Sequence, residues 1–111
     1  MSKSLVDKLM RARERNVVVG SRTYTIRRPT DAEALQMQGQ DAIDFVRRFV
    51  VGWDLAECDL TPGGGPEKVP FDAELWKAWV DDHPELWIPL ATEVINDFKK
   101  HVEAREGNAK N

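Results

Sequence analysis

The spacing of hydrophobic residues switches between helical and strand periods along this chain, and each switch predicts an element. Near the N-terminus, Leu5 and Leu9 are one helical turn apart in a segment rich in basic residues, which indicates a basic helix or arm over residues 1–15. Over residues 16–28, apolar and polar residues alternate on both sides of Gly20. Alternation around a glycine that supplies a positive φ is typical of a β-hairpin, so we predict two strands here.

The next segment, residues 31–55, is predicted to be helical. Thr30 and Glu33 have the spacing of a capping box, in which the threonine hydroxyl and the glutamate carboxylate each accept a hydrogen bond from a backbone amide of the first turn. A second helix is expected over residues 41–51, with Gly52 as its C-terminal cap. One face of this helix, with the residue that follows it, carries side chains that we expect in the core: Ile43, Val46, Phe49 and Trp53.

The C-terminal half is predicted to be a loop followed by a pair of helices. Three glycines and three prolines fall within residues 59–70, which indicates a flexible loop. Residues 72–106 have the pattern of two helices, with Pro84 at the first position of the second one. The polar tail, residues 107–111, is expected to be disordered. An apolar stripe along the last helix should complete the core with Leu90, Val94 and Phe98.

Three tryptophans lie within twelve residues of the helix pair, and their spacing places them at one junction. Trp76 and Trp79 are three residues apart and share a side of their helix, while Trp87 lies near the start of the next helix. Aromatic residues at helical spacing are more often core than interface, but four tryptophans in a small domain are seldom all fully buried. We therefore place Trp53 and Trp79 in the core. We expect at least one of Trp76 and Trp87 to be partly exposed and to contact a partner.

Together these elements predict one α+β domain over residues 1–111, mostly helical, in which an N-terminal β-hairpin packs on four to five α-helices. With 111 residues, 41% of them hydrophobic, the chain can form one core. No apolar run approaches the ~20 residues that cross a bilayer, and the N-terminus lacks a secretory pattern, so we expect no membrane partner. A single cysteine, Cys58, excludes an internal disulfide and favours the cytoplasm.

The net charge of −3 conceals a division between the two ends of the chain. Residues 1–28 hold eight Lys/Arg against two acidic residues, a net of +6, whereas residues 29–111 hold eight against seventeen, a net of −9. Arg11, Arg13 and Arg15 are therefore candidate contacts to a partner, either to phosphates or to the acidic part of a second copy. The interpretation that we favour is a solvated basic segment whose charges contribute little.

The titratable side chains do not form a catalytic or metal-binding pattern. His83 follows two aspartates in a turn where helix capping explains the acids, and His101 is one turn after Asp97, as in a surface pair. Cys58 lies between two acidic residues, which raise the pKa of a thiol and disfavour a nucleophile. With one cysteine and two distant histidines, a zinc site is not expected. We therefore predict a non-enzymatic protein with no cofactor and no metal.

Three short motifs resemble a known family. Residues 51–55 (VGWDL), residues 69–72 (VPFD) and residues 26–33 (IRRPTDAE) are similar to segments of the tail assembly chaperones of long-tailed bacteriophages and prophages, and the likeness extends over residues 24–106. The resemblance implies a protein of the bacterial host cytoplasm that coats the helical tape measure protein before the tail tube polymerises and is absent from the mature virion. It implies no catalytic residue.

The same resemblance implies several partners, and two other classes of function stay open. The tape measure protein is the expected client, with the tail tube protein as a second partner and self-association along the client. One alternative is a small nucleic-acid-binding or regulatory protein that uses the basic N-terminal segment, although the acidic remainder argues against nucleic acid. The other alternative is a structural tail or connector subunit, for which longer strands would be expected.

Overall fold

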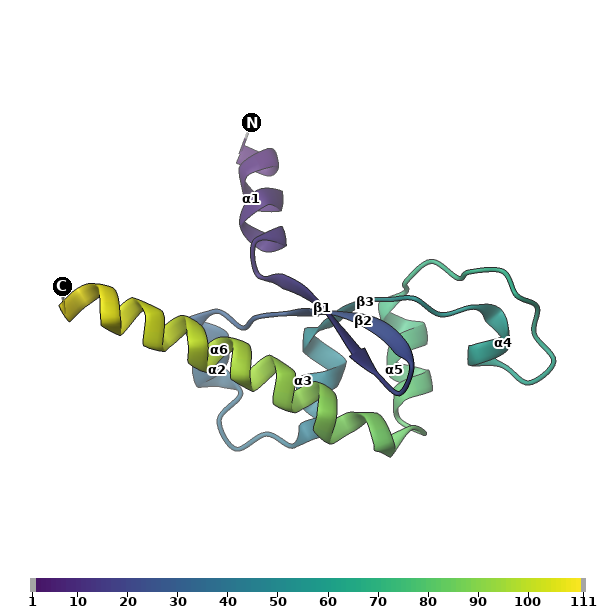
Figure 1. Ribbon diagram of the computed structural model, residues 1–111. Helices are drawn as coiled ribbons and strands as arrows, with labels where there is room; N and C mark the ends of the chain where they lie inside the picture. The colour runs from purple at the N-terminus through teal and green to yellow at the C-terminus, as the bar shows by residue number, and fades with distance from the viewer. Residues whose placement is uncertain (1, 111) are drawn as a thin grey trace.

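The computed structural model describes residues 2–110, and in this range it is an α+β protein, mostly helical, as predicted. A three-stranded antiparallel sheet packs with one face against helices, while one helix and the end of another project from this body (Figure 1). In chain order the elements are α1 (Ser2–Arg11), β1 (Glu14–Val19), β2 (Arg22–Arg27), α2 (Asp31–Gln36), α3 (Ala42–Phe49), β3 (Val50–Trp53), α4 (Glu57–Leu60), α5 (Ala73–Val80), the 3-10 helix η1 (Pro84–Leu86) and α6 (Trp87–Lys110).

The predicted hairpin is present as β1 and β2. The two turn residues, Gly20 and Ser21, both have positive φ (59° and 70°), which is the geometry that matches the twist of a tight hairpin. The hairpin is longer than expected, because Glu14 pairs with Arg27 at its open end. The predicted N-terminal helix therefore ends at Arg11 rather than at residue 15, and Met1 lies outside the described residues.

The predicted helix over residues 41–51 is wrong at its C-terminal end. Helix α3 ends at Phe49, and the next four residues form β3, which pairs with β2 as the third strand. Two β-branched valines at this point favour an extended backbone. Gly52 is not a helix cap: it lies opposite Thr25, and a Cβ added to it would be 2.9 Å from the Cβ of Thr25. Glycine is therefore required by the close approach of two strands.

The core lies between the sheet and helices α3, α5 and α6. Along β2, Tyr24 and Ile26 point into this core while their neighbours alternate outward. The predicted core positions Val46, Phe49, Leu90 and Val94 are completely buried, and Ile43 packs half-buried at the edge. Phe98, the last of the predicted core residues, is half-buried outside this cluster.

The tryptophans match the prediction in part: Trp87 is partly exposed, as expected for at least one of Trp76 and Trp87, but the fully buried one is Trp76 and not Trp53 or Trp79. Trp76 is 0% exposed and is the largest fully buried side chain, so it cannot contact a partner. Its ring lies 5.7 Å from that of Tyr24, 6.1 Å from Trp53 and 5.8 Å from Trp79. Trp53 and Trp79 are half-buried against the core, and so is Trp87. The error arose because the buried face of α5 carries Trp76 and Val80, one turn apart, and not Trp79.

The C-terminal half departs from the prediction in two places. The segment predicted as a loop over residues 59–70 begins inside the short helix α4 and folds back on itself, with the amide of Cys58 donating to the carbonyl of Gly65 (2.9 Å). Helix α6 continues through Gly107 to Lys110, so the tail predicted to be disordered is helical as far as it is described. Glutamate, alanine and arginine just before the tail, over residues 103–106, are strong helix formers. Asn111 lies outside the described residues.

We expect replacement of Gly52 by alanine to lower the free energy of unfolding by about 1–3 kcal/mol, because the new methyl group would press on Thr25 in the adjacent strand. Denaturant unfolding followed by circular dichroism measures this change. Gly107→Ala is the matched control, since nothing lies within 4 Å of a Cβ at that helical position, and it should leave stability unchanged or slightly raised. An unchanged unfolding midpoint for Gly52→Ala would contradict the close approach.

Candidate partner-binding groove

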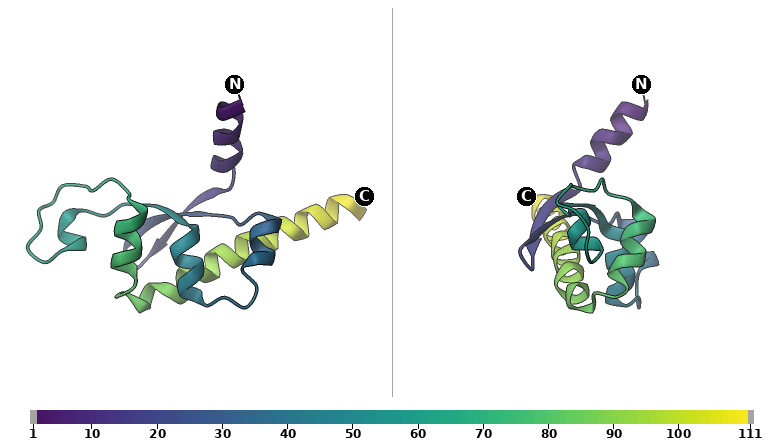
Figure 2. Two further views of the ribbon diagram at one scale, coloured as in Figure 1. Left: turned by 180° about the vertical axis from the view of Figure 1, so that it is seen from behind. Right: turned by 90° about the vertical axis from the view of Figure 1, so that its right-hand side faces the viewer.

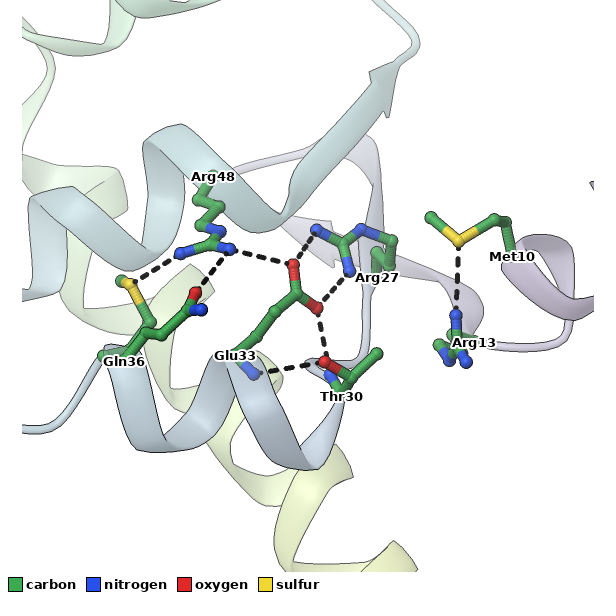
Figure 3. Close-up of polar contacts among 8 residues, drawn as sticks. Met10, Arg13, Arg27, Thr30, Glu33, Gln36 and Arg48 are labelled. Carbon is green, nitrogen blue, oxygen red and sulfur yellow. Dashed lines mark hydrogen bonds and ion pairs between the residues drawn. The ribbon is translucent and has the colours of Figure 1, made fainter. Parts of the chain in front are cut away.

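The residues predicted to bind a partner do not form one site. Trp76 is buried, and Trp87 is half-buried, with its indole Nε1 donating to the carbonyl of Val80 (2.8 Å). Arg11 is exposed on α1, whereas Arg13 contacts the sulfur of Met10 (3.2 Å) (Figure 3). These side chains come from distant parts of the fold, and no common surface joins them.

Arg15 is engaged inside the chain. Its guanidinium donates to both carboxylate oxygens of Asp97 (2.9 and 3.1 Å) and to Glu93 (2.7 Å), so it ties β1 to α6. These carboxylates raise the pKa of Arg15 above its ordinary value, chiefly through the hydrogen bond to Asp97. Further along the hairpin, Arg22 pairs with Asp59. The division of charge seen in the sequence is thus partly used within the molecule, where basic strands meet acidic helices.

An open apolar groove lies between α2 and α6. It has a volume of about 650 Å³, and we call it the α2–α6 groove. Leu35 stands at its edge with 70% of its surface exposed, and Ile95 is 37% exposed. The polar residues around it are Asp31, Gln38 and Gln40. Its apolar lining comes from α2 and the segments beside it, from α3 and from α6: Pro29, Ala34, Leu35, Met37, Phe45, Ile95 and Phe98.

The groove stays open because α2, which forms one of its edges, is too short to cover it. Thr30 caps this helix in the predicted capping box, with its hydroxyl accepting from the amide of Glu33 (3.1 Å). Within two turns the helix ends, and Gly39 follows with a φ of 80°, which turns the chain toward α3. No side chain of α2 itself is buried. Its apolar residues therefore line a surface rather than fill the core.

Glu33 fixes α2 to the rest of the protein (Figure 3). Its carboxylate accepts two hydrogen bonds from Arg27 on β2 (2.7 and 2.9 Å) and one from Arg48 on α3 (3.2 Å). The backbone amide of Thr30 donates a further one (3.0 Å). The Arg27 hydrogen bond, more than any other contact, lowers the pKa of Glu33 to about 2. This half-buried cluster holds one wall of the groove in place.

His83 and Cys58 are the remaining side chains that the sequence offered as candidates for chemistry. His83 stacks on Trp79 at 3.8 Å between ring centroids, and its Nδ1 lies 2.7 Å from the carbonyl of the same residue. Cys58 is exposed and free. Within residues 2–110, no three His, Cys, Asp or Glu side chains gather closely enough to hold a metal ion. In the same range, no helix has the length and apolar character needed to span a membrane.

Comparison of the sequence with models of protein families and with curated proteins, and of the structure with solved structures, finds no match. Function is therefore inferred from the groove and its surroundings. Reasoning from the sequence missed this groove, because its apolar residues are drawn from segments 50 or more positions apart. The signal present in the sequence was Leu35, an apolar residue outside every stripe assigned to the core.

The Glu33 cluster should make stability depend on pH in a defined window. A carboxylate whose pKa falls from 4.5 to about 2 on folding contributes its full stabilisation above pH 4.5 and loses it as the pH falls toward 2. At pH 7 we expect Glu33→Gln to cost about 3 kcal/mol, and we expect this cost to shrink by about 2 kcal/mol at pH 3. Denaturant unfolding at the two pH values measures both quantities.

Glu74→Gln is the matched control, because Glu74 is 88% exposed and reaches only Lys77, at 3.8 Å. It should change stability by less than about 0.5 kcal/mol at either pH. A cost for Glu33→Gln that is equal at pH 7 and pH 3 would show that the carboxylate charge does not stabilise α2.

Proposed function

We propose that this protein is a non-enzymatic tail assembly chaperone of a long-tailed phage or prophage, which binds a helical segment of the tape measure protein in the α2–α6 groove. The open apolar groove is the observation that carries the proposal. It is supported by the motifs at residues 26–33, 51–55 and 69–72, which resemble those of this family. In this role the protein works in the host cytoplasm and does not remain in the finished virion.

The chemistry of the groove suits an amphipathic helix. Such a helix presents apolar anchors at positions i, i+3, i+4 and i+7, which need a long apolar groove with polar groups at its edge. Leu35, Phe45 and Ile95 offer apolar contacts from three different elements. Gln38 and Gln40 at the rim are neutral and can accept and donate hydrogen bonds, so they do not require a particular charge on the partner. A surface of this kind binds many related helices, as a protein that coats a long helical client must.

A nucleic-acid function is less well supported. Contacts to phosphates need arginines that are free to meet them. Arg15, Arg22 and Arg27 instead form ion pairs with carboxylates of the same chain. Within residues 2–28, the basic residues that form no ion pair are Arg28 and those of α1 and its connection. We therefore assign the client site to the groove and not to the basic segment.

We expect co-expression with the tape measure protein from the same genome to keep that client soluble and to yield a complex that co-purifies. Leu35→Asp and Ile95→Asp should each reduce the co-purified client by about tenfold or more, because each places a charge in the apolar contact. Affinity capture of the tagged chaperone, followed by quantification of the client, gives the measurement.

Ile88→Asp is the control for this experiment. Ile88 is 67% exposed on α6, like Leu35 on α2, but does not line the groove. It should leave capture of the client unchanged. A client that stays insoluble with the wild-type protein would refute the chaperone role, and equal losses with all three variants would refute the groove as its site.

A further inference from the structure

Helix α1 carries an apolar face that is exposed. Leu5, Val6 and Leu9 are 62%, 53% and 60% exposed, and Met10 at the end of the same face is 37% exposed. The helix projects away from the sheet and from the other helices, and two further views show the same projection (Figure 2). A ten-residue helix is marginal in water unless one face is packed. The exposed face therefore indicates a surface that packs against something.

The total surface of the chain indicates how large that contact is. The accessible surface is 7307 Å², whereas a compact monomer of 12.7 kDa exposes about 6,200 Å². The radius of gyration, 15.6 Å, also exceeds the value of about 13 Å expected for this length. The excess of roughly 1,000 Å² is close to the ~800 Å² that each partner buries in a standard interface. The excess surface of the monomer is therefore about the size that one subunit buries in a dimer.

The α2–α6 groove of the same copy is not within reach of α1. The connection to β1 is only Ala12 and Arg13, and both amides are hydrogen-bonded to carbonyls of α1 (3.0 and 3.1 Å). The carbonyl of Arg13 also accepts from the amide of Arg28 (2.8 Å), which fixes the connection to the hairpin. Helix α1 leaves the sheet on the side opposite to α3 and the connection from α2, in Figures 1 and 2 alike. An occupant of the groove must come from another molecule.

Helix α1 is basic, and two acidic side chains stand next to the groove, whose own charged residue, Asp31, is paired with Arg105 (2.7 Å). The helix carries Lys3, Lys8 and Arg11 against a single acid, Asp7. Beside Gln40 at the rim of the groove, Asp41 and Asp44 stand at the start of α3, and within the described residues neither forms an ion pair with a basic side chain. Opposite charges around an apolar contact fix its orientation and disfavour other partners.

We propose that α1 of one copy packs in the α2–α6 groove of a second copy, and that reciprocal exchange of the two helices forms a two-fold symmetric dimer. Leu5 and Leu9 enter the groove against Leu35, Phe45 and Ile95. Each copy provides both halves of the contact, so two identical contacts form at once and the assembly closes. The association itself does not depend on the identity of any client.

The dimer has a consequence that rests on the proposed function. If the groove also receives the helix of the client, α1 and the client compete for one site. Client binding then releases α1, and the dimer is replaced by copies that each hold the client in the groove. Self-association in the absence of a client keeps the apolar groove covered.

Sedimentation equilibrium of the purified full chain tests the association. The wild-type protein should be a dimer at tens of micromolar. The double variant Leu5→Asp/Leu9→Asp should be a monomer, and so should Leu35→Asp, because each exposed leucine replaced by aspartate weakens the contact by about tenfold or more. Ile88→Asp, the exposed control outside the groove, should remain a dimer. Circular dichroism verifies that each variant is folded, and Leu35→Gln replaces Leu35→Asp if the aspartate variant is not folded.

Comparison of the two variants gives the decisive result. Each variant alters both symmetric contacts of the dimer, so both should be monomeric at the concentration at which the wild-type protein is a dimer. A monomeric wild-type protein would overturn the proposal. So would a groove variant that stays dimeric, which would indicate that α1 pairs with α1 of a second copy, or an α1 variant that stays dimeric. None of these outcomes bears on whether the groove binds the client, which the co-expression experiment decides separately.

Discussion

The burial of one indole organises this fold. Trp76 is enclosed on all sides, and its Nε1 must find an acceptor because an unpaired donor in the core is costly. The acceptor is the carbonyl of Val46 on α3 (2.9 Å), which also accepts from the amide of Val50 at the point where the helix becomes a strand. One carbonyl thus joins α5 to the transition from α3 to β3. The position of the third strand and the packing of the helices depend on this shared bond.

Ion pairs between the hairpin and the helices form a second level of organisation. Arg15 holds α6 against β1, and Arg27 holds α2 against β2 through Glu33. Both arginines belong to the basic N-terminal part, and their partners belong to the acidic remainder. The charge division therefore positions the helices that form the two walls of the groove. The more deeply buried of these pairs is the stronger contributor, since solvent screens the exposed one.

Features encoded by near neighbours could be predicted from the sequence, and features that need distant partners could not. The hairpin turn at Gly20 and the capping box of Thr30 depend on residues at most four apart, and both are present as expected. Strand β3 escaped prediction because its extended form is selected by pairing with β2, more than twenty residues earlier. The groove escaped for the same reason, since Leu35 and Ile95 meet only in the folded chain. For Trp76, helical spacing predicted the helix correctly. It could not predict which of two adjacent faces of that helix is buried.

Because α1 projects from the body, substitutions in α1 and substitutions in the core have different consequences. Substitutions in the core are filtered by their effect on folding, whereas the exposed face of Leu5 and Leu9 contributes little to the stability of the body. Changes on that face are therefore tested only through what it binds. Substitutions in α1 can leave the fold intact and still change how the helix binds, so variation in α1 is expected to be matched by variation in the groove that receives it.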